Sequence, residues 1–178
     1  MKKSVVDLSD LQEIAPFFKT KFGIFLGKKI IKWLGIKKVN DIHAKHCHLR
    51  GADFTTALLQ DPLMDIKYNV HNAELLDTLP EGAFITISNH PFGHIDGIML
   101  IDIFASRRND FAVMVNGVLT KIGAMEDNFI SVQPDSKNRG ANVANVNGVR
   151  TSLERLKSGH PMGFFPAGAI SFYNKEKK

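Results

Sequence analysis

The sequence predicts an α/β protein with a largely parallel sheet flanked by helices, preceded by an N-terminal helical region. Short β-rich runs alternate with helical patterns after Pro62, whereas the residues before it show mainly helical spacing. The chain of 178 residues is 44% hydrophobic and 23% charged, a composition typical of a folded domain with a buried core. We therefore expect residues 1–60 to form a basic, amphipathic, membrane-facing helical region and residues 61–178 to form the α/β core, together as one folded unit.

The N-terminal region contains three predicted helical stretches. Ser9-Asp10-Leu11-Gln12 has the pattern of a capping box that opens a short helix, which Pro16 disturbs. Residues 40–60 are helical again, with a break near Arg50-Gly51. Residues 20–35 form the helix between them, in which four apolar side chains fall within one third of the circumference: Phe22, Leu26, Ile30 and Trp33.

This middle helix and its surroundings are unusually basic. Between Phe17 and Lys38 there is no acidic residue, and there are seven lysines, at positions 19, 21, 28, 29, 32, 37 and 38. A helix with lysines beside Phe, Ile and Trp suits the surface of an anionic membrane; the alternative is an ordinary amphipathic helix packed on the domain. Nucleic-acid binding, which the pI of 9.3 suggests, is disfavoured because the chain has no recognised nucleic-acid motif.

Membrane contact of this kind would be peripheral. No run of the sequence approaches the roughly 18 apolar residues needed to span a bilayer. The N-terminus reaches Asp7 before any apolar stretch forms, so we expect no signal peptide. The single cysteine, Cys47, excludes an intramolecular disulfide and fits a reducing compartment.

The second part of the chain alternates between strand-like and helical patterns. The predicted elements are a strand at Ile66–Val70, a strand at 83–88, a buried helix at 97–106, strands at 111–115 and 129–132, a helix at 141–157 and a strand at 162–165. In sheets built this way, functional residues gather where strands end and helices begin.

Four residues whose side chains can bind metal ions lie close together in the N-terminal region, namely His43, His46, Cys47 and His48. Their spacing does not match the paired Cys/His clusters of structural zinc sites, and no second cluster follows. We therefore expect no metal here, and interpret these side chains as exposed or partly packed helix residues.

The clearest chemical signal is Asn89-His90, directly after the strand at 83–88, with Asp96 opening the next helix. A carboxylate one helical turn beyond a histidine can accept from one ring nitrogen and leave the other free to take a proton from a hydroxyl. Pro91 and Gly93 stiffen and bend the loop between them. The alternative is that His90 and Asp96 only cap the helix and form hydrogen bonds at a turn.

A second segment is Gly163-Phe164-Phe165-Pro166-Ala167-Gly168-Ala169-Ile170-Ser171. A strand running into Pro-Ala-Gly exposes backbone amides, and glycine lets the backbone approach a ligand closely. Alone, the segment is equally compatible with a plain strand-to-loop turn.

Together, these two segments resemble the glycerophospholipid acyltransferase superfamily, which is marked by an Asn-His-x4-Asp block and a later Phe-Pro-Glu-Gly-Thr-Arg-Ser block. Asn89-His90-Pro91-Phe92-Gly93 with Asp96-Gly97, and Phe165-Pro166-Ala167-Gly168, are most similar to a bacterial branch described as hemolysin-like or lysophospholipid-type acyltransferases, some of which are proposed to make amino-acid lipids. The stretch 115–130 also fits. The resemblance covers roughly residues 40 to 172 and is most specific at the first block.

The resemblance implies an O-acyltransferase that moves a fatty acyl group from acyl carrier protein or coenzyme A to the hydroxyl of a lysolipid or amino-acid lipid. His90 would be the general base and Asp96 would orient it, with backbone amides near Gly93 or Gly168 as candidates for stabilising the oxyanion. No cofactor beyond the acyl donor and no metal is implied, and the enzyme would work peripherally at the cytoplasmic face of the inner membrane. The implied substrate-binding residues are Asn89, Gly93, Pro166, Gly168 and Ser171.

Three features depart from the family pattern. Five residues, not four, separate His90 from Asp96, and His94 stands where the branch has glycine; we interpret His94 as a bystander. The second block lacks the family's Glu and Arg, so a phosphate would need other partners, for which Lys137, Arg139 and Arg150 are candidates if they are more than solvated surface charge. Members also usually continue beyond the position of Lys178. These departures leave a second reading, a truncated, non-catalytic relative that binds membranes or lipids.

Overall fold

The α/β part of the computed structural model is built on four short strands, β1 (Ile85–Ile87), β2 (Ala112–Asn116), β3 (Phe129–Val132) and β4 (Met162–Phe164). The strands are all parallel and lie in the order β1-β4-β2-β3. The structure describes residues 4–5, 7–33, 35–117, 119, 122–132, 143–168 and 170. The predicted fold class, an α/β layer of parallel strands flanked by helices, is confirmed.

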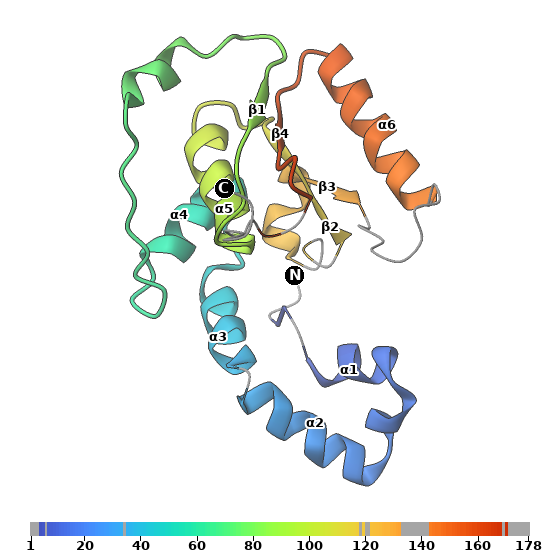
Figure 1. Ribbon diagram of the computed structural model, residues 1–178. Helices are drawn as coiled ribbons and strands as arrows, with labels where there is room; N and C mark the ends of the chain where they lie inside the picture. Colours follow the sequence, from blue (N-terminus) through green and yellow to red (C-terminus); the bar gives the residue numbers. More distant parts are fainter. Residues whose placement is uncertain are drawn as a thin grey trace, which may run out of the picture.

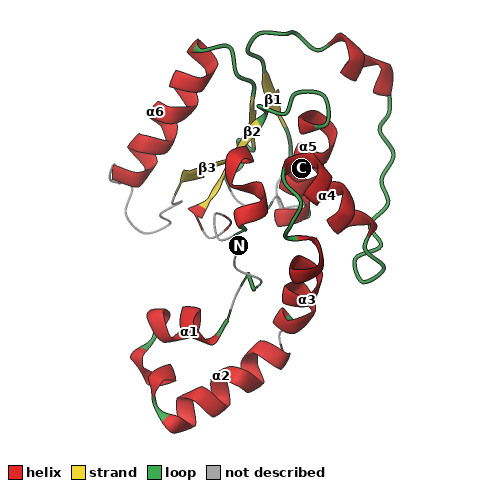
Figure 2. Cartoon of the chain, turned by 180° about the vertical axis from the view of Figure 1, so that it is seen from behind, coloured by secondary structure: helices red, strands yellow, loops and turns green. Residues whose placement is uncertain are grey.

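Two helices cover the sheet from opposite sides (Figures 1 and 2). Helix α5 (His94–Ala105) follows β1, and α6 (Val143–Lys157) follows β3. Helix α6 lies so close to β3 that a Cβ at Gly148 would come within 2.6 Å of the Ser131 carbonyl oxygen. On the other side, the core is formed by buried apolar residues of α5, β2, β3 and neighbouring segments: Phe54, Leu100, Ile101, Ala105, Phe111, Val113, Val115, Ala124, Met125 and Phe129.

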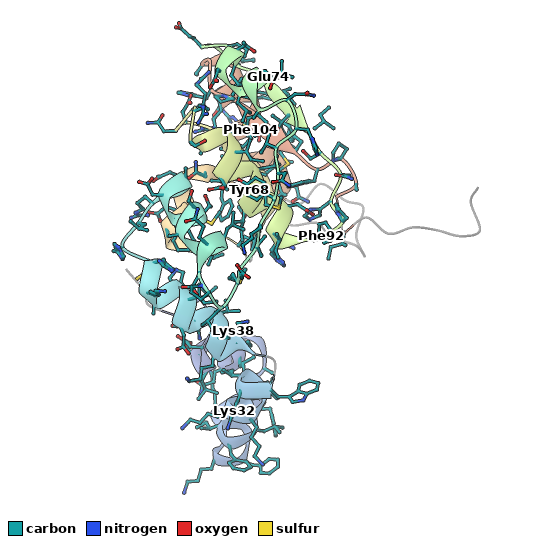
Figure 3. The ribbon with its side chains drawn as sticks, turned by 90° about the vertical axis from the view of Figure 1, so that its left-hand side faces the viewer. Lys32, Lys38, Tyr68, Glu74, Phe92 and Phe104 are labelled. Carbon is teal, nitrogen blue, oxygen red and sulfur yellow. The ribbon has the colours of Figure 1, made fainter. Side chains whose placement is uncertain are left out.

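The N-terminal helices α1 (Leu8–Ile14), α2 (Lys21–Trp33) and α3 (Ile36–His46) form an arm that extends from the α/β part (Figure 1). A short 3₁₀ segment, η1 (Pro16–Lys19), joins α1 to α2, and α4 (Gly51–Gln60) packs against α5. Lys32 and Lys38 lie on the arm, well apart from Phe104 in the α/β part (Figure 3). Within the described ranges, no helix is both long and apolar enough to cross a bilayer.

The first helix begins two residues earlier than predicted. Asp7, not Ser9, is the N-cap: its side chain accepts a hydrogen bond from the Ser9 backbone N–H at 2.9 Å. Asp10 closes the capping box, because its carboxylate accepts from the Asp7 backbone N–H at 2.8 Å. An aspartate caps a helix as well as a serine does, and the hydrogen bonds of the structure show that the helix is capped by Asp7. Pro16 ends the helix as predicted.

The arm packs through glycines of α2. Gly23 and Gly27 are buried: the Phe17 carbonyl oxygen leaves no room for a Cβ at Gly23, and a Cβ at Gly27 would lie 2.8 Å from Leu8 Cδ1. As a result, the four apolar residues that the sequence placed on one stripe of α2 differ in their exposure. Phe22 and Trp33 are exposed, whereas Leu26 and Ile30, the other two members, are half-buried.

The predicted strand at Ile66–Val70 is wrong. The segment is extended, but no strand pairs with it, and β1 pairs only with β4 within the described sheet. Its alternating pattern has another cause: Ile66 and Tyr68 are partly buried while Lys67 points to solvent. The Tyr68 hydroxyl donates to Asp102 of α5, so the segment packs against a helix instead of a strand (Figure 3). A 3₁₀ segment, η2 (Ala73–Thr78), follows before β1.

The remaining elements form where they were predicted, with small shifts at their ends. Helix α5 begins at His94, three residues before the predicted start, and the strands differ from their predicted bounds by one or two residues. A further 3₁₀ segment, η4 (Gly123–Asn128), precedes β3 and contributes Met125 to the core. The division of the chain at residues 60 and 61 stays a prediction.

Candidate active site

The two sequence blocks meet at one edge of the sheet because β1 and β4 are neighbours. Their register pairs Ile87 with Phe164, and the Ser88 backbone N–H donates to the Phe164 carbonyl at 3.1 Å. Both strands are parallel, so the residues after Ile87 and Phe164 leave the sheet together at its carboxyl edge, where ligands bind in open α/β sheets. Two segments that are about 70 residues apart in the chain are thereby brought side by side.

His90 and Asp96 face each other at this edge. His90 Nδ1 lies 3.1 Å from Asp96 Oδ2, and the two side chains are 20% and 13% exposed. Asp96 is in the first turn of α5, where the helix dipole favours a negative charge. The same Oδ2 atom accepts a hydrogen bond from the Phe92 backbone N–H at 2.9 Å. The Asp96 carboxylate therefore lies between the His90 ring and the backbone of the loop that carries His90.

Gly93 makes this arrangement possible. It is the N-cap of α5 and has φ +65° and ψ −128°, a conformation that residues with a Cβ rarely adopt. A Cβ there would also lie 3.2 Å from Ile170 Cδ1. The Gly93 carbonyl accepts from the Asp96 N–H at 3.1 Å. The sharp turn absorbs the fifth residue between His90 and Asp96 and still brings the two side chains together.

The second block lies against the first. The Phe165 ring stacks on the His90 imidazole with centroids 4.3 Å apart and an interplanar angle of 30°. Pro166 and Gly168 are exposed in the turn that follows, where Gly168 has φ +64° and its N–H donates to the Phe165 carbonyl at 3.0 Å. The Gly168 amide is thus already engaged within its own turn.

Of the other predicted binding residues, Asn89 is exposed beside His90, and Ser171 lies outside the described residues. His94 is exposed at the start of α5. Two residues that sequence reasoning missed are Phe165, which stacks on the candidate base, and Ile170, which lies over Gly93. Both are in the quoted second block, but only the strand register shows which residues of the first block they contact.

Of the three basic residues suggested as phosphate ligands, the one that the structure describes does not lie at the candidate site. Arg150 lies on the surface of α6 and pairs with Glu154 at 2.9 Å. Lys137 and Arg139 lie outside the described residues.

The histidines at 43–48 have separate surroundings. His43 is buried, with its ring edge-on to Phe54 at 5.8 Å, and His48 is exposed. His46 Nε2 lies 2.8 Å from the buried carboxylate of Asp61, which also accepts from Lys45 Nζ at 2.8 Å. In the part of the chain that the structure describes, no three His, Cys, Asp or Glu side chains gather in a way that could hold a metal ion.

The Asp61 carboxylate is a strongly bonded acid. The hydrogen bond from Lys45, with others from the Leu63 backbone N–H and His46, holds the pKa of Asp61 well below its usual range. The cluster joins α3 to the turn after α4. It is distant in sequence from the His90 block and serves the attachment of the arm.

The fold and site therefore define an α/β protein with a histidine–aspartate pair at the carboxyl edge of a parallel sheet. A family model described as acyltransferase matches residues 11–174. The chain belongs to this acyltransferase family, and its general function is acyl transfer. Searches of curated proteins and of solved structures gave no match.

Proposed function

We propose that the protein is an O-acyltransferase that moves a fatty acyl group from acyl carrier protein or coenzyme A to the hydroxyl of a lysolipid or amino-acid lipid, as in the hemolysin-like branch. The observation that carries this proposal is the 3.1 Å approach of His90 Nδ1 to Asp96 Oδ2. A carboxylate beside one ring nitrogen is the arrangement that orients a histidine as a general base, whose other nitrogen would take the proton of the substrate.

In the proposed reaction, His90 Nε2 takes the proton of the acceptor hydroxyl while the hydroxyl oxygen attacks the carbonyl carbon of the thioester. The resulting tetrahedral intermediate expels the thiolate of the donor, which takes the proton back from the imidazolium. Asp96 stabilises the imidazolium while it exists. No covalent acyl-enzyme is formed, so no serine or cysteine nucleophile is required.

The start of α5 is the better candidate for stabilising the oxyanion. The first N–H groups of a helix have no partner within it, and among the described residues no side chain caps α5. The N–H groups of His94 and Ile95 are in this position, two residues and one residue before Asp96. The Gly168 amide is a poorer candidate, because it already donates to the Phe165 carbonyl.

The lipid acceptor implies work at a membrane surface, and we propose that α2 provides the contact. Trp33 is 85% exposed, and Phe22 and Phe25 are also largely exposed. Lys29 lies over the Phe25 ring, with its Nζ 4.7 Å from the ring centroid. Aromatic side chains interleaved with lysines suit the interface of an anionic bilayer. We place the protein peripherally at the cytoplasmic face of the inner membrane.

The test is an acyl-transfer assay with labelled acyl carrier protein or acyl-coenzyme A, and with a lysophospholipid or a hydroxyl-bearing amino-acid lipid as acceptor. His90→Ala and Asp96→Asn should each lower kcat by roughly 10²- to 10⁴-fold, the range of general-base catalysis. His90→Ala at the unmutated rate would refute the mechanism.

The chain contains a matched control. His160 Nδ1 lies 2.8 Å from Asp110 Oδ2, but this pair precedes β4 and β2 and so belongs to the amino edge of the sheet. His160→Ala should therefore leave transfer unchanged. If the unmutated protein binds anionic vesicles but transfers from neither donor to either acceptor, the non-catalytic reading replaces the proposed enzyme.

A further inference from the structure

We propose that Phe165 is a positioning residue for the reaction, because its ring fixes the plane of the His90 imidazole. This inference rests on the proposed function for its kinetic consequence, but its structural content is separate. The two rings lie 4.3 Å apart, centroid to centroid, at an interplanar angle of 30°. Phe165 is thus the aromatic side chain against one face of the candidate base.

Asp96 and Phe165 restrain the imidazole in different ways. The carboxylate approaches a single ring atom, Nδ1, at 3.1 Å. A contact with a single edge atom fixes the position of that atom but only weakly opposes rocking of the ring about the contact direction, which swings Nε2. A ring stacked on the imidazole face opposes this rocking, because tilted and offset aromatic pairs have a preferred geometry. The face contact therefore adds a restraint on the direction of Nε2 that the edge contact does not supply.

Phe165 is itself held from three directions. Its backbone continues from β4, whose pairing with β1 sets the height of Phe165 relative to His90. Its ring packs against the main core, and its Cε2 would lie 3.9 Å from a Cβ at Gly97, the residue after Asp96. The Gly168 N–H closes the turn behind it by donating to its carbonyl. A ring supported this firmly can restrain its neighbour.

The stacking also covers one face of the base. His90 is only 20% exposed, and Phe165 is the aromatic ring that lies against it. The covered face does not block the proposed proton transfer, because the lone pair of Nε2 lies in the plane of the ring and is reached at its edge. Phe165 takes no proton and forms no bond in the proposed reaction. Its contribution is the orientation of a residue that does.

The experiment compares three variants of the full chain. Phe165→Leu removes the ring and keeps an apolar side chain, while Phe165→Tyr retains the ring. Phe104→Leu is the matched control, since Phe104 is a partly buried phenylalanine on the same core that stacks on Phe111 at 5.0 Å. Stability is measured for each by urea unfolding. Transfer is measured as kcat and KM, and the His90 ring by ¹H–¹⁵N NMR, with His90→Gln to assign its signals.

Phe165→Leu should lower kcat about tenfold, in line with the strength of one aromatic pair, with little change in the KM of the acyl donor. Phe165→Tyr should restore most of the rate. The ring protons of His90 should lose the upfield displacement caused by a stacked ring, and the Nδ1–H tautomer that Asp96 favours should give way to a mixture. Phe104→Leu should change the unfolding free energy without altering the rate or the His90 spectrum.

The inference is overturned if Phe165→Leu keeps the His90 tautomer and ring-proton shifts of the unmutated protein, or if its rate falls no further than that of Phe104→Leu. The spectra also separate this inference from the proposed function. If the unmutated protein transfers no acyl group, the enzymatic proposal fails, while the His90 spectra of the two leucine variants still decide whether Phe165 orders the imidazole.

Discussion

Gly93 offers the sharpest test of how the backbone builds the candidate site. Replacing it with alanine introduces two costs that the structure allows us to separate. The backbone conformation at φ +65°, ψ −128° is strained for any residue with a Cβ, by about 1–3 kcal/mol. The new methyl group would also lie 3.2 Å from Ile170 Cδ1, which requires a small movement of that side chain or of the turn.

We therefore expect Gly93→Ala to lower the free energy of unfolding by about 2–3 kcal/mol, which for a domain of this size corresponds to a fall in Tm of roughly 4–12 °C. It should also lower the transfer rate, because Gly93 accepts from the Asp96 N–H and sets the start of α5. A turn that relaxes toward an ordinary conformation moves Asp96 relative to His90.

Gly159→Ala is the matched control. Gly159 has φ +89°, and no heavy atom lies within 4 Å of the position of its Cβ, so alanine there carries backbone strain without a steric contact. It precedes β4, at the opposite edge of the sheet from His90. Both variants are measured by urea unfolding and by the acyl-transfer assay. If Gly93→Ala is as stable as the unmutated protein, or as active as Gly159→Ala, the reasoning about this turn is wrong.

Two further predictions concern the arm. Asp61→Asn should destabilise the protein at pH 7. Because the pKa of Asp61 is lowered on folding, the stability that its charged carboxylate contributes should be lost progressively as pH falls below the ordinary value of 3.8. Urea unfolding should show the free energies of the two proteins converging in acid, and a difference at pH 3 equal to that at pH 7 would contradict the assignment. Trp33, the single tryptophan, should shift its emission to the blue on vesicles of phosphatidylglycerol and phosphatidylcholine. The variant with Lys28, Lys29 and Lys32 all changed to Gln should bind these vesicles about 100-fold more weakly, at about 1 kcal/mol per lysine; unchanged binding would exclude α2 as the contact.

The sequence by itself determined the features that depend on local spacing and on residue type. The alternation of strands and helices predicted the parallel α/β class, and the helices at 20–35, 97–106 and 141–157 form within a few residues of their predicted bounds. The spacing of His90 and Asp96 across a turn was sufficient to predict that the two side chains could meet. These features could be predicted from the sequence because they depend on residues that are neighbours in the chain or lie one helical turn apart.

The tertiary structure decided what depends on partners distant in the chain. Ile66–Val70 has the alternation of a strand but packs on a helix, because a strand needs a neighbour that no local pattern supplies. The buried glycines of α2 determine which aromatic side chains face outward. The stacking of Phe165 on His90 follows from the β1–β4 register, which joins segments some 70 residues apart. The His90–Asp96 pair therefore comes from one segment of the sequence, whereas the Phe165 ring reaches His90 only because the sheet places β1 beside β4.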